Sequence, residues 1–402
     1  MKYRRIVAIC GTMRNLPVLI VCALALAALS TCHLTGETGG TSGAPSFEER
    51  IAQAAEDIAV ERSPEEEWLD DRLFALGTDL EGKVGIAASD PARGRMMHFN
   101  GTDLYPQQSV SKLWVALAAL EMADRGELDL GERGTVRVDD LAVFHSPIRK
   151  TVVANGSFTT TYADFIERAL TQSDNTANDM VLRRVGGPDA VRRVLARKGF
   201  ADIRFGPGER PMQSAIAGLE WQQSYALGKT FFEVRKTVPH SVRRDAFDRY
   251  VQDPVDGASP VAIAAALAQL QSGELLSDGG TSRFLAWLGD VKSGPNRLKG
   301  GLPEGWRIAH KTGTGQVLDI VPPGQPGYQA GYNDVGILTA PDGTIYTVAV
   351  LIGKTIAPVP ERMEMMHGVV RAVAGYHEMM AGAGANRADE PVPVGTPEAA
   401  TS

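Results

Sequence analysis

The feature that most constrains the fold is the placement of strand-forming segments near both ends of the chain, around a mostly helical stretch. The segments with a strand pattern are 83–89, 95–100, 306–311, 335–339 and 344–352. The residues between them space their apolar side chains as helices do. We therefore predict an α/β fold of the α+β type, in which both chain ends form one antiparallel sheet and an all-helical subdomain of about 109–290 is inserted. Such a fold has a cleft where the two parts meet.

The sequence divides into four regions. Residues 1–32 read as a signal peptide, 33–46 as a flexible linker of small residues, and 47–380 as the folded body. A helix is expected at 46–74, with Ser46 as its N-cap, and another at 360–380. The tail at 381–402, rich in Ala, Gly, Pro and Glu, is expected to be disordered.

The leader predicts export. Its basic residues are Lys2, Arg4, Arg5 and Arg14. The uncharged stretch that follows is short for a bilayer span, and it ends near Cys32, a candidate for lipid attachment. Simple cleavage and an uncleaved anchor are the two alternatives. We expect a periplasmic protein that meets a membrane only through this leader or a lipidated Cys32.

Composition excludes several classes of function. The 3 cysteines, Cys10, Cys22 and Cys32, all lie in the leader, so the body has no thiol for a disulfide, for catalysis or for zinc. The formal net charge of −7 over 402 residues argues against a nucleic-acid partner, because phosphate binding needs a concentrated basic face. The histidines form no close ligand cluster, so we expect no metal and no cofactor. We expect a monomer.

Ser109-Val110-Ser111-Lys112 is the single Ser-x-x-Lys of the sequence. It opens a nearly uniformly apolar helical stretch that ends at Gly126. Residues three apart share a helix face, so the Lys112 amine should lie beside the Ser109 hydroxyl. Burial of a lysine favours its neutral amine, which can accept a proton from a serine nucleophile. The alternative is a serine cap followed by a lysine that extends to solvent.

Two further motifs have both chemical and structural interpretations. Ser173-Asp174-Asn175 precedes a helical stretch and could cap it; its hydroxyl could also relay a proton, and its amide could bind a carbonyl. Lys311-Thr312-Gly313 follows a predicted strand and could be an ordinary strand end. Alternatively, the lysine and threonine could hold a carboxylate, while the glycine lets a substrate approach the strand.

The order of these three motifs resembles that of the class A serine β-lactamases. The resemblance extends from about Val84 to Lys354. It includes further segments on either side of the motifs, namely Tyr105 to Gln108, Gly126 to Leu130, Ser146-Pro147 and Gly301 to Pro303. It implies a β-lactamase/transpeptidase-like catalytic domain over residues 47–380.

The resemblance also implies roles for single residues. Ser109 would attack a β-lactam amide, and Lys112, with or without Glu209 through water, would accept its proton. Ser173 would pass a proton to the departing ring nitrogen. The backbone N–H groups of Ser109 and Thr314 would stabilise the oxyanion. The implied substrate-binding residues are Asn175, Lys311, Thr312, Gly313, Thr314 and Gln213.

Hydrolysis of the ester needs an acid that activates water, and the resemblance assigns this role to Glu209. Gln213 lies four residues on, where the family usually has asparagine. Arg210 separates Glu209 from Pro211, whereas family members commonly have proline directly after the glutamate. A solvated Glu209 paired with Arg210 is the alternative, and Glu220 is a weaker substitute.

Two long segments depart from the family pattern, at about 214–257 and 316–332. Each could shape the mouth of the cleft or decorate the surface. Two rival functions also stay open: a D,D-peptidase or transpeptidase acting on cell-wall stem peptides, and a non-catalytic cell-wall-binding lipoprotein with an inherited cleft. No motif for a Gly-x-Ser-x-Gly elbow, a His-Glu-x-x-His helix or a phosphate loop is present.

Overall fold

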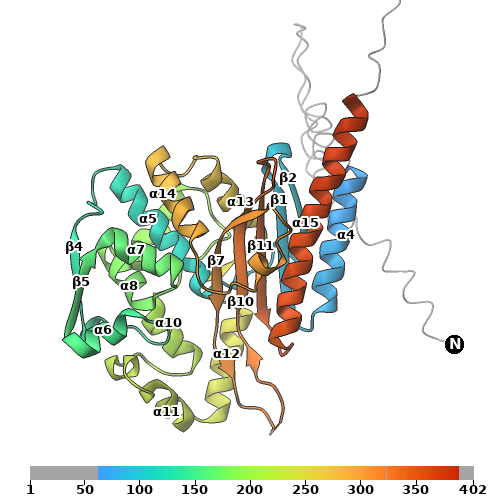
Figure 1. The fold of residues 1–402 in the computed structure, drawn as a ribbon. Helices are drawn as coiled ribbons and strands as arrows, with labels where there is room; N and C mark the ends of the chain where they lie inside the picture. The colour runs from blue at the N-terminus through green and yellow to red at the C-terminus, as the bar shows by residue number, and fades with distance from the viewer. Residues whose placement is uncertain (1–61, 323, 389–402) are drawn as a thin grey trace, which may run out of the picture. The chain divides into compact units, whose positions relative to one another are not determined.

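The computed structural model describes residues 62–322 and 324–388. Its central element is an antiparallel five-stranded sheet with the strand order β2-β1-β11-β10-β7 (Figure 1). The strands are β1 (Lys83–Asp90), β2 (Arg95–Phe99), β7 (Arg307–Thr314), β10 (Tyr332–Thr339) and β11 (Ile345–Lys354). β1 and β2 come from the N-terminal side of the helical region and the others from its C-terminal side. The predicted sheet built from both ends is therefore confirmed.

Both faces of the sheet are covered. Successive side chains of a strand point to opposite faces, and in β11 Val348 and Val350 join one apolar cluster while Ala349 and Leu351 join another. A strand buried on both faces needs a continuous apolar run, which β11 has. The sheet is thus the middle layer of three.

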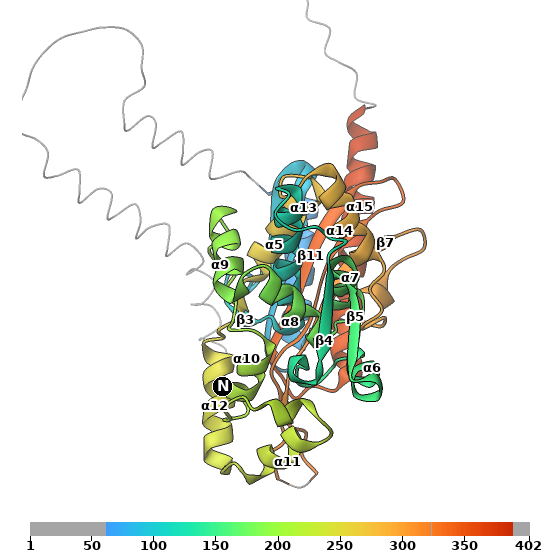
Figure 2. The ribbon, with the colours of Figure 1, turned by 90° about the vertical axis from the view of Figure 1, so that its left-hand side faces the viewer.

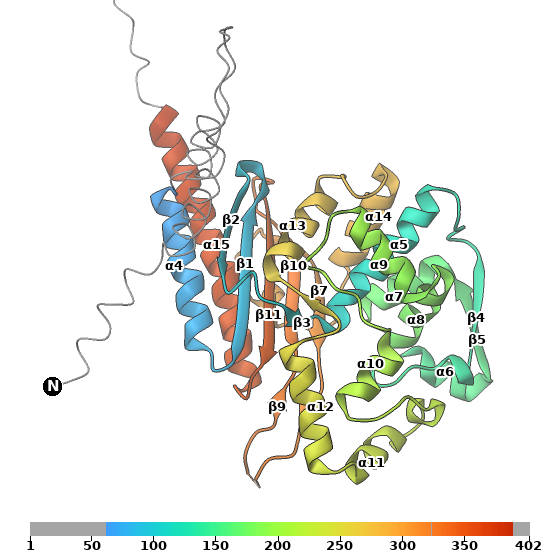
Figure 3. The ribbon, with the colours of Figure 1, turned by 180° about the vertical axis from the view of Figure 1, so that it is seen from behind.

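The outer layer consists of α4 (Pro64–Asp79) and α15 (Val359–Ala388), which lie side by side on one face of the sheet (Figures 1 and 3). Ser63 caps α4, because its hydroxyl accepts from the Glu66 N–H and the Glu66 carboxylate accepts from the Ser63 N–H. The described helix therefore begins at Pro64 rather than at the predicted cap, Ser46, which lies outside the described residues.

The C-terminal helix also differs from the prediction. α15 continues past the expected end at Met380 to Ala388, so the first residues of the predicted disordered tail are helical. The rest of that tail, the predicted signal peptide and the predicted linker lie outside the described residues. Within the described part of the chain, no helix combines the length and apolar character needed to cross a membrane.

The inner layer contains α13 (Pro260–Gln271), which packs on the sheet, and the helical subdomain beyond it. The subdomain helices are α5 (Lys112–Asp124), α6 (Ile148–Asn155), α7 (Tyr162–Thr171), α8 (Asn175–Arg184), α9 (Gly187–Arg197), α10 (Glu209–Ile216) and α14 (Asp278–Gly289). α5 lies at their centre, and every residue from Lys112 to Leu120 is buried. This uniform burial explains why its sequence is apolar on all sides.

The subdomain is not entirely helical. A two-stranded antiparallel ribbon, β4 (Arg133–Arg137) and β5 (Ser157–Thr161), flanks α6 (Figure 2). β5 is rich in threonine, whose branched Cβ suits a strand. A second short pair joins β3 (Tyr105–Pro106), just before Ser109, to β6 (Gly257–Ala258).

The two long segments that depart from the family pattern are packed structures. The first folds into η4 (Gln223–Ala226), α11 (Thr230–Thr237) and α12 (His240–Gln252), and the second forms the hairpin of β8 (Val317–Leu318) and β9 (Tyr328–Gln329). They share an apolar cluster in which Phe247 and Tyr250 of α12 meet Leu318. Figure 3 shows α12 next to the β9 end of the hairpin.

Candidate active site

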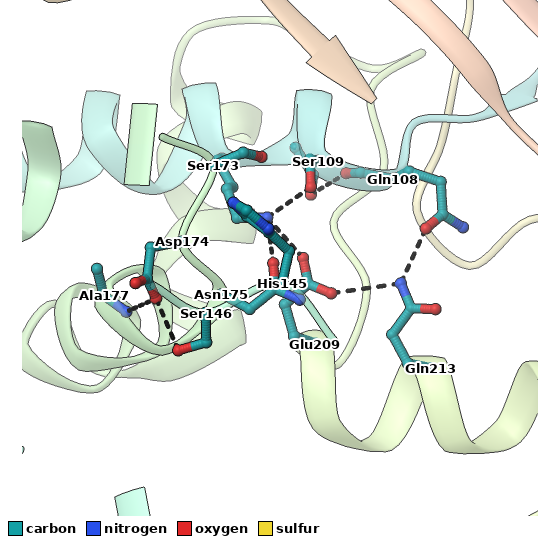
Figure 4. A network of polar contacts seen from close by, with 12 residues as sticks. Gln108, Ser109, His145, Ser146, Ser173, Asp174, Asn175, Ala177, Glu209 and Gln213 are labelled. Carbon is teal, nitrogen blue, oxygen red and sulfur yellow. Dashed lines mark hydrogen bonds and ion pairs between the residues drawn. The ribbon is translucent and has the colours of Figure 1, made fainter. Parts of the chain in front are cut away.

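The Ser109–Lys112 pair lies where a short turn becomes a buried helix. Gln108–Ser111 forms the 3-10 turn η2, which leads directly into α5. Gln108 has a φ of 54°, a left-handed conformation that is strained for a side chain of this kind. The Lys112 Nζ donates to the Ser109 Oγ at 2.6 Å, so the predicted contact between them is present. Figure 4 shows Gln108 and Ser109 side by side at this turn.

Lys112 connects three parts of the site. Its amine also contacts the Asn175 Oδ1 at 2.8 Å and the Glu209 Oε1 at 2.9 Å. The lysine is 1% exposed, so it does not extend to solvent as the alternative interpretation required. A proton taken from Ser109 can therefore pass along existing hydrogen bonds toward Glu209.

Glu209 points inward from the first turn of α10 and is 5% exposed. Its Oε1 pairs with Lys112 and its Oε2 accepts from the Gln213 Nε2 at 3.3 Å. Arg210 turns away, with its Nε 3.4 Å from the Asp179 Oδ2. The solvated pair of Glu209 and Arg210 is therefore not formed. Glu220, the substitute candidate, is exposed.

Gln213 is held by amides on both sides. Its Nε2 donates to the Gln108 Oε1 at 2.8 Å, and its Oε1 accepts from the Gln316 Nε2 at 3.0 Å. Each amide can serve as donor and acceptor at once, so the Gln213 side chain has a defined orientation next to Glu209.

A buried pair that the sequence analysis missed supports Gln108 from behind. The Tyr250 hydroxyl contacts the Gln108 Nε2 and lies 3.0 Å from the Asp256 Oδ1, while the Asp256 Oδ2 accepts from the Gln108 N–H at 2.8 Å. Burial raises the pKa of Asp256 to about 6, and burial with the nearby carboxylate raises the pKa of Tyr250 well above its ordinary value. Tyr250 and Asp256 thus link the long segment at 214–257 to Gln108, the residue before Ser109.

The Ser173-Asp174-Asn175 motif combines capping with site chemistry. Asp174 caps α8, because its Oδ1 accepts from the N–H groups of Thr176 and Ala177 at 2.8 and 3.0 Å. Ser173 has a φ of 57°, and its Oγ accepts from the Lys311 Nζ at 3.1 Å. The structural interpretation thus holds for the aspartate, and the serine faces the cavity.

Asn175 is fixed by three hydrogen bonds. Its Oδ1 accepts from Lys112, its Nδ2 donates to the Val143 carbonyl at 2.9 Å, and its backbone N–H donates to the His145 carbonyl at 3.0 Å. The residue is buried but still lines the cavity.

Lys311 is completely buried under the cavity. Burial, followed by repulsion from Lys112, holds the pKa of Lys311 well below its usual range. Besides Ser173, its Nζ contacts the Thr312 carbonyl at 3.0 Å. Lys311 does not line the cavity, whereas Thr312 and Thr314 of the same strand do.

Gly313 is required by the packing of the protein itself. A Cβ at this position would lie 2.4 Å from the Gln107 carbonyl oxygen, a distance that real Cβ atoms do not show. The absence of a side chain lets η2 approach β7, so this glycine would be needed even without a substrate.

Arg297 was not identified from the sequence, because it lies in a loop without a motif. Its Nη1 donates to the carbonyls of Gly313 and Asn333 at 2.9 and 2.7 Å, and its Nη2 contacts the Thr314 Oγ1. It also stacks 3.8 Å from the centre of the Tyr332 ring. Together with Ser293, whose Oγ is 2.6 Å from the Thr312 Oγ1, it gives one end of the site a cation and three hydroxyls.

These groups surround a cavity of about 280 Å³. Its lining residues are Ser109, Phe144, His145, Gln172, Ser173, Asn175, Glu209, Gln213, Ser293, Gly294, Arg297, Thr312 and Thr314. A carboxylate suits the end at Arg297 and Thr314. Next to the Ser109 hydroxyl, the amine of Lys112 and the carboxylate of Glu209 can exchange protons, and the Lys311 amine can do the same with Ser173. Such an arrangement suits attack by a serine on a carbonyl carbon.

Two histidines near the site have different positions. The His310 Nδ1 lies 2.9 Å from the Asp334 Oδ1, and His310 does not line the cavity. His145 lines the cavity, with its Nε2 2.9 Å from the Gln172 carbonyl. Among the residues at 62–322 and 324–388, no group of three or more potential ligands is arranged to hold a metal.

Comparisons with known proteins agree with this geometry. The sequence model of the β-lactamase enzyme family matches residues 69–376. The chain is 26% identical to β-lactamase VEB-1 of Pseudomonas aeruginosa, over 68% of this chain and 78% of the relative. It is also 26% identical to the extended-spectrum β-lactamase PER-1 of the same species, over 73% of this chain and 82% of the relative.

Solved structures give the same result. An ancestral class A β-lactamase superposes with a TM-score of 0.60 at 29% identity, over 76% of this chain and 99% of that structure. The TLA-1 extended-spectrum β-lactamase has a TM-score of 0.63 at 24% identity, over 77% and 98% of the two chains, and so supports the fold.

Proposed function

The chain belongs to the class A β-lactamase family, and we propose that it hydrolyses β-lactam antibiotics through an ester on Ser109. The Ser109 Oγ forms a bond to the β-lactam carbonyl carbon, and its proton moves to Lys112, or through water to Glu209. The backbone N–H groups of Ser109 and Thr314 stabilise the oxyanion. The ring C–N bond then breaks.

Ser173 gives its proton to the departing nitrogen and is reprotonated by the proton that Ser109 gave up. Its hydroxyl is 3.1 Å from the Lys311 Nζ, and burial holds the pKa of Lys311 well below its usual range, which favours a neutral amine that can exchange a proton with this hydroxyl. We infer that Arg297, Thr312 and Thr314 receive the substrate carboxylate, with Lys311 beneath them, and that Asn175 orients the acyl amide.

Hydrolysis of the Ser109 ester is the step that distinguishes a β-lactamase from the alternatives. Glu209 takes a proton from water, and the water oxygen attacks the ester carbon. The bond from that carbon to the Ser109 Oγ then breaks, and the oxygen takes back the proton from Glu209 through Lys112. The supporting observation is the burial of the Glu209 carboxylate between the Lys112 amine and the Gln213 amide, close to Ser109. A carboxylate in this place can activate water for deacylation, which a peptidase that merely traps the drug does not need.

The proposal is tested by following intact-protein mass and product formation after addition of a chromogenic cephalosporin. We expect steady turnover by the wild-type protein and accumulation of an acyl adduct in Glu209→Gln. One stable adduct on the wild-type protein would instead support the D,D-peptidase or transpeptidase. The absence of any adduct would support a binding protein.

The location and assembly of the protein belong to the same proposal. The predicted leader and the family support export to the periplasm, with attachment to a membrane only through that leader or Cys32. We propose a monomer whose substrate is a small molecule and whose chemistry uses side chains without a cofactor.

A further inference from the structure

We propose that Phe144, Phe232 and Val317 form a binding site for a bulky aromatic acyl side chain of the β-lactam. This inference rests on the proposed function and names a substrate class for it. The three residues line a second cavity, of about 420 Å³, that neighbours the cavity at Ser109. Phe232 and Val317 come from the two segments that depart from the family pattern.

The second cavity adjoins the catalytic cavity, with which it shares part of its lining. Phe144, His145, Gln213 and Thr314 line both cavities. Ser293, Arg297 and Thr312 line the catalytic cavity alone, where a carboxylate is expected. The carboxylate and the acylamino group of penicillins and cephalosporins project from opposite sides of the fused rings. A substrate with its carboxylate near Arg297 therefore directs its acyl side chain toward the second cavity.

The wall of this cavity is aromatic. The Phe144 ring lies 4.8 Å from Phe231 and 5.9 Å from Phe232, and the last two rings are 5.7 Å apart in an edge arrangement. Phe231 is buried and anchors the group, whereas Phe232 is 44% exposed. Phe144 has a φ of 61°, a conformation that is costly for a bulky residue. A further ring can stack here in the offset and edge geometries that aromatic pairs prefer.

A second wall, from the segment at 316–332, is apolar at Val317, which is 41% exposed. Two arginines tie the two walls together, since Arg235 and Arg243 both bond Asp319, the first at 3.0 Å. Arg235 also lies 5.4 Å from the centre of the Phe232 ring, which restrains that side chain. The cavity is thus formed before a ligand enters, which limits the ordering cost of binding.

The test compares two cephalosporins with the same ring system and leaving group, one with an acetyl and one with a naphthylacetyl side chain. We expect Phe232→Ala to lower kcat/KM for the naphthylacetyl compound about tenfold and to leave the acetyl compound within about twofold. Phe74→Ala is the matched control, because Phe74 is 59% exposed on α4, on the far face of the sheet.

Val317→Ala provides a second variant on the other wall, with Val153→Ala as its control, since Val153 is 60% exposed on α6. We expect a smaller, about threefold, loss with the naphthylacetyl compound alone. Equal losses for both compounds, or none for either, would overturn the aromatic site while hydrolysis itself persists. If the wild-type protein hydrolyses neither compound, the proposed function fails, and this inference fails with it.

Discussion

The part of the site that would form the ester and the part that would hydrolyse it are held in different ways. Ser109 and Lys112 are neighbours at one helix start. Ser173 lies just before α8, and Lys311 lies within β7. Glu209, in contrast, lies on a short helix that is kept in place by side chains from distant segments.

This difference separates two kinds of dependence on sequence. The ester-forming part follows from short motifs on buried elements, so a similar geometry can arise wherever those motifs fold. The hydrolytic part depends on the Gln108, Tyr250 and Asp256 contacts, which join segments far apart in the chain. Substitutions in the long segment at 214–257 should therefore slow hydrolysis of the ester more than they slow its formation.

The largest effect is expected from Lys112→Met, which breaks the ester-forming part. It removes the amine bonded to Ser109, and we expect the acylation rate, measured by intact mass in a rapid-quench series, to fall about 10²- to 10⁴-fold. Lys150→Met is the control, because Lys150 is exposed on α6. If acylation survives in Lys112→Met but is lost in Glu209→Gln, the acylation base is Glu209 acting through water.

The next effect concerns Asp179 of α8, whose carboxylate is repelled by the Glu209 carboxylate of the hydrolytic part. Burial, and then repulsion from Glu209, raises the pKa of Asp179 from its ordinary 3.8 to about 7. The folded protein thus binds this proton more tightly than the unfolded chain, so the stabilisation is complete below about pH 4 and is lost as pH rises through about 7.

Asp179→Asn should remove that dependence. We expect the variant to gain on the order of 2 kcal/mol in free energy of unfolding at pH 8, and to lose most of the decline in stability between about pH 4 and 7. Denaturant unfolding at several pH values measures this, with exposed Asp103→Asn as control. A variant that keeps the wild-type pH profile would show that Asp179 is ionised in the folded protein throughout this range.

A smaller effect is expected from Tyr250→Phe, which sharpens the comparison because it loosens the Gln108 side chain that holds Gln213 beside Glu209. It removes the hydroxyl between Gln108 and Asp256, and we expect deacylation to slow about tenfold while acylation changes less than threefold. Tyr328→Phe is the control, since Tyr328 is 40% exposed. Equal slowing of both steps would mean that the two parts are supported together.

The smallest effect is expected from Asp319→Asn, which removes the ion pairs that Asp319 makes with Arg235 and Arg243 between the two long segments. Asp319 is half exposed, so we expect the free energy of unfolding to fall by less than about 1 kcal/mol, and less in high salt. Thermal unfolding at two salt concentrations measures this, beside Asp253→Asn, which cuts the exposed pair with Arg204. A fall in the free energy of unfolding as large as that caused by a core substitution would contradict the view that Asp319 makes only a half-exposed ion pair.

Much of the fold and the ester-forming part could be predicted from the sequence, because both depend on local patterns. Strand segments are short apolar runs, and Ser109 and Lys112 are related by helix spacing alone. The hydrolytic support could not be predicted, since Tyr250 reads as one more apolar residue of a helix until the fold brings it to Gln108. Arg297 was missed for a similar reason, because two of its partners are backbone carbonyls, which no side-chain motif encodes, and Thr314 and Tyr332 are brought to it only by the fold.

Pairing of β1 with β11 at the centre of the sheet has a consequence for how the protein acquires its structure. More than half of the chain separates these strands, and contacts of such high contact order form slowly, because a long loop must close first. During synthesis, the β1 edge of the early hairpin of β1 and β2 stays unpaired until β11 has emerged, and an unpaired edge can pair with other chains. A nascent molecule is therefore most exposed to aggregation just before its final quarter is complete, which is the interval in which a chaperone would protect it.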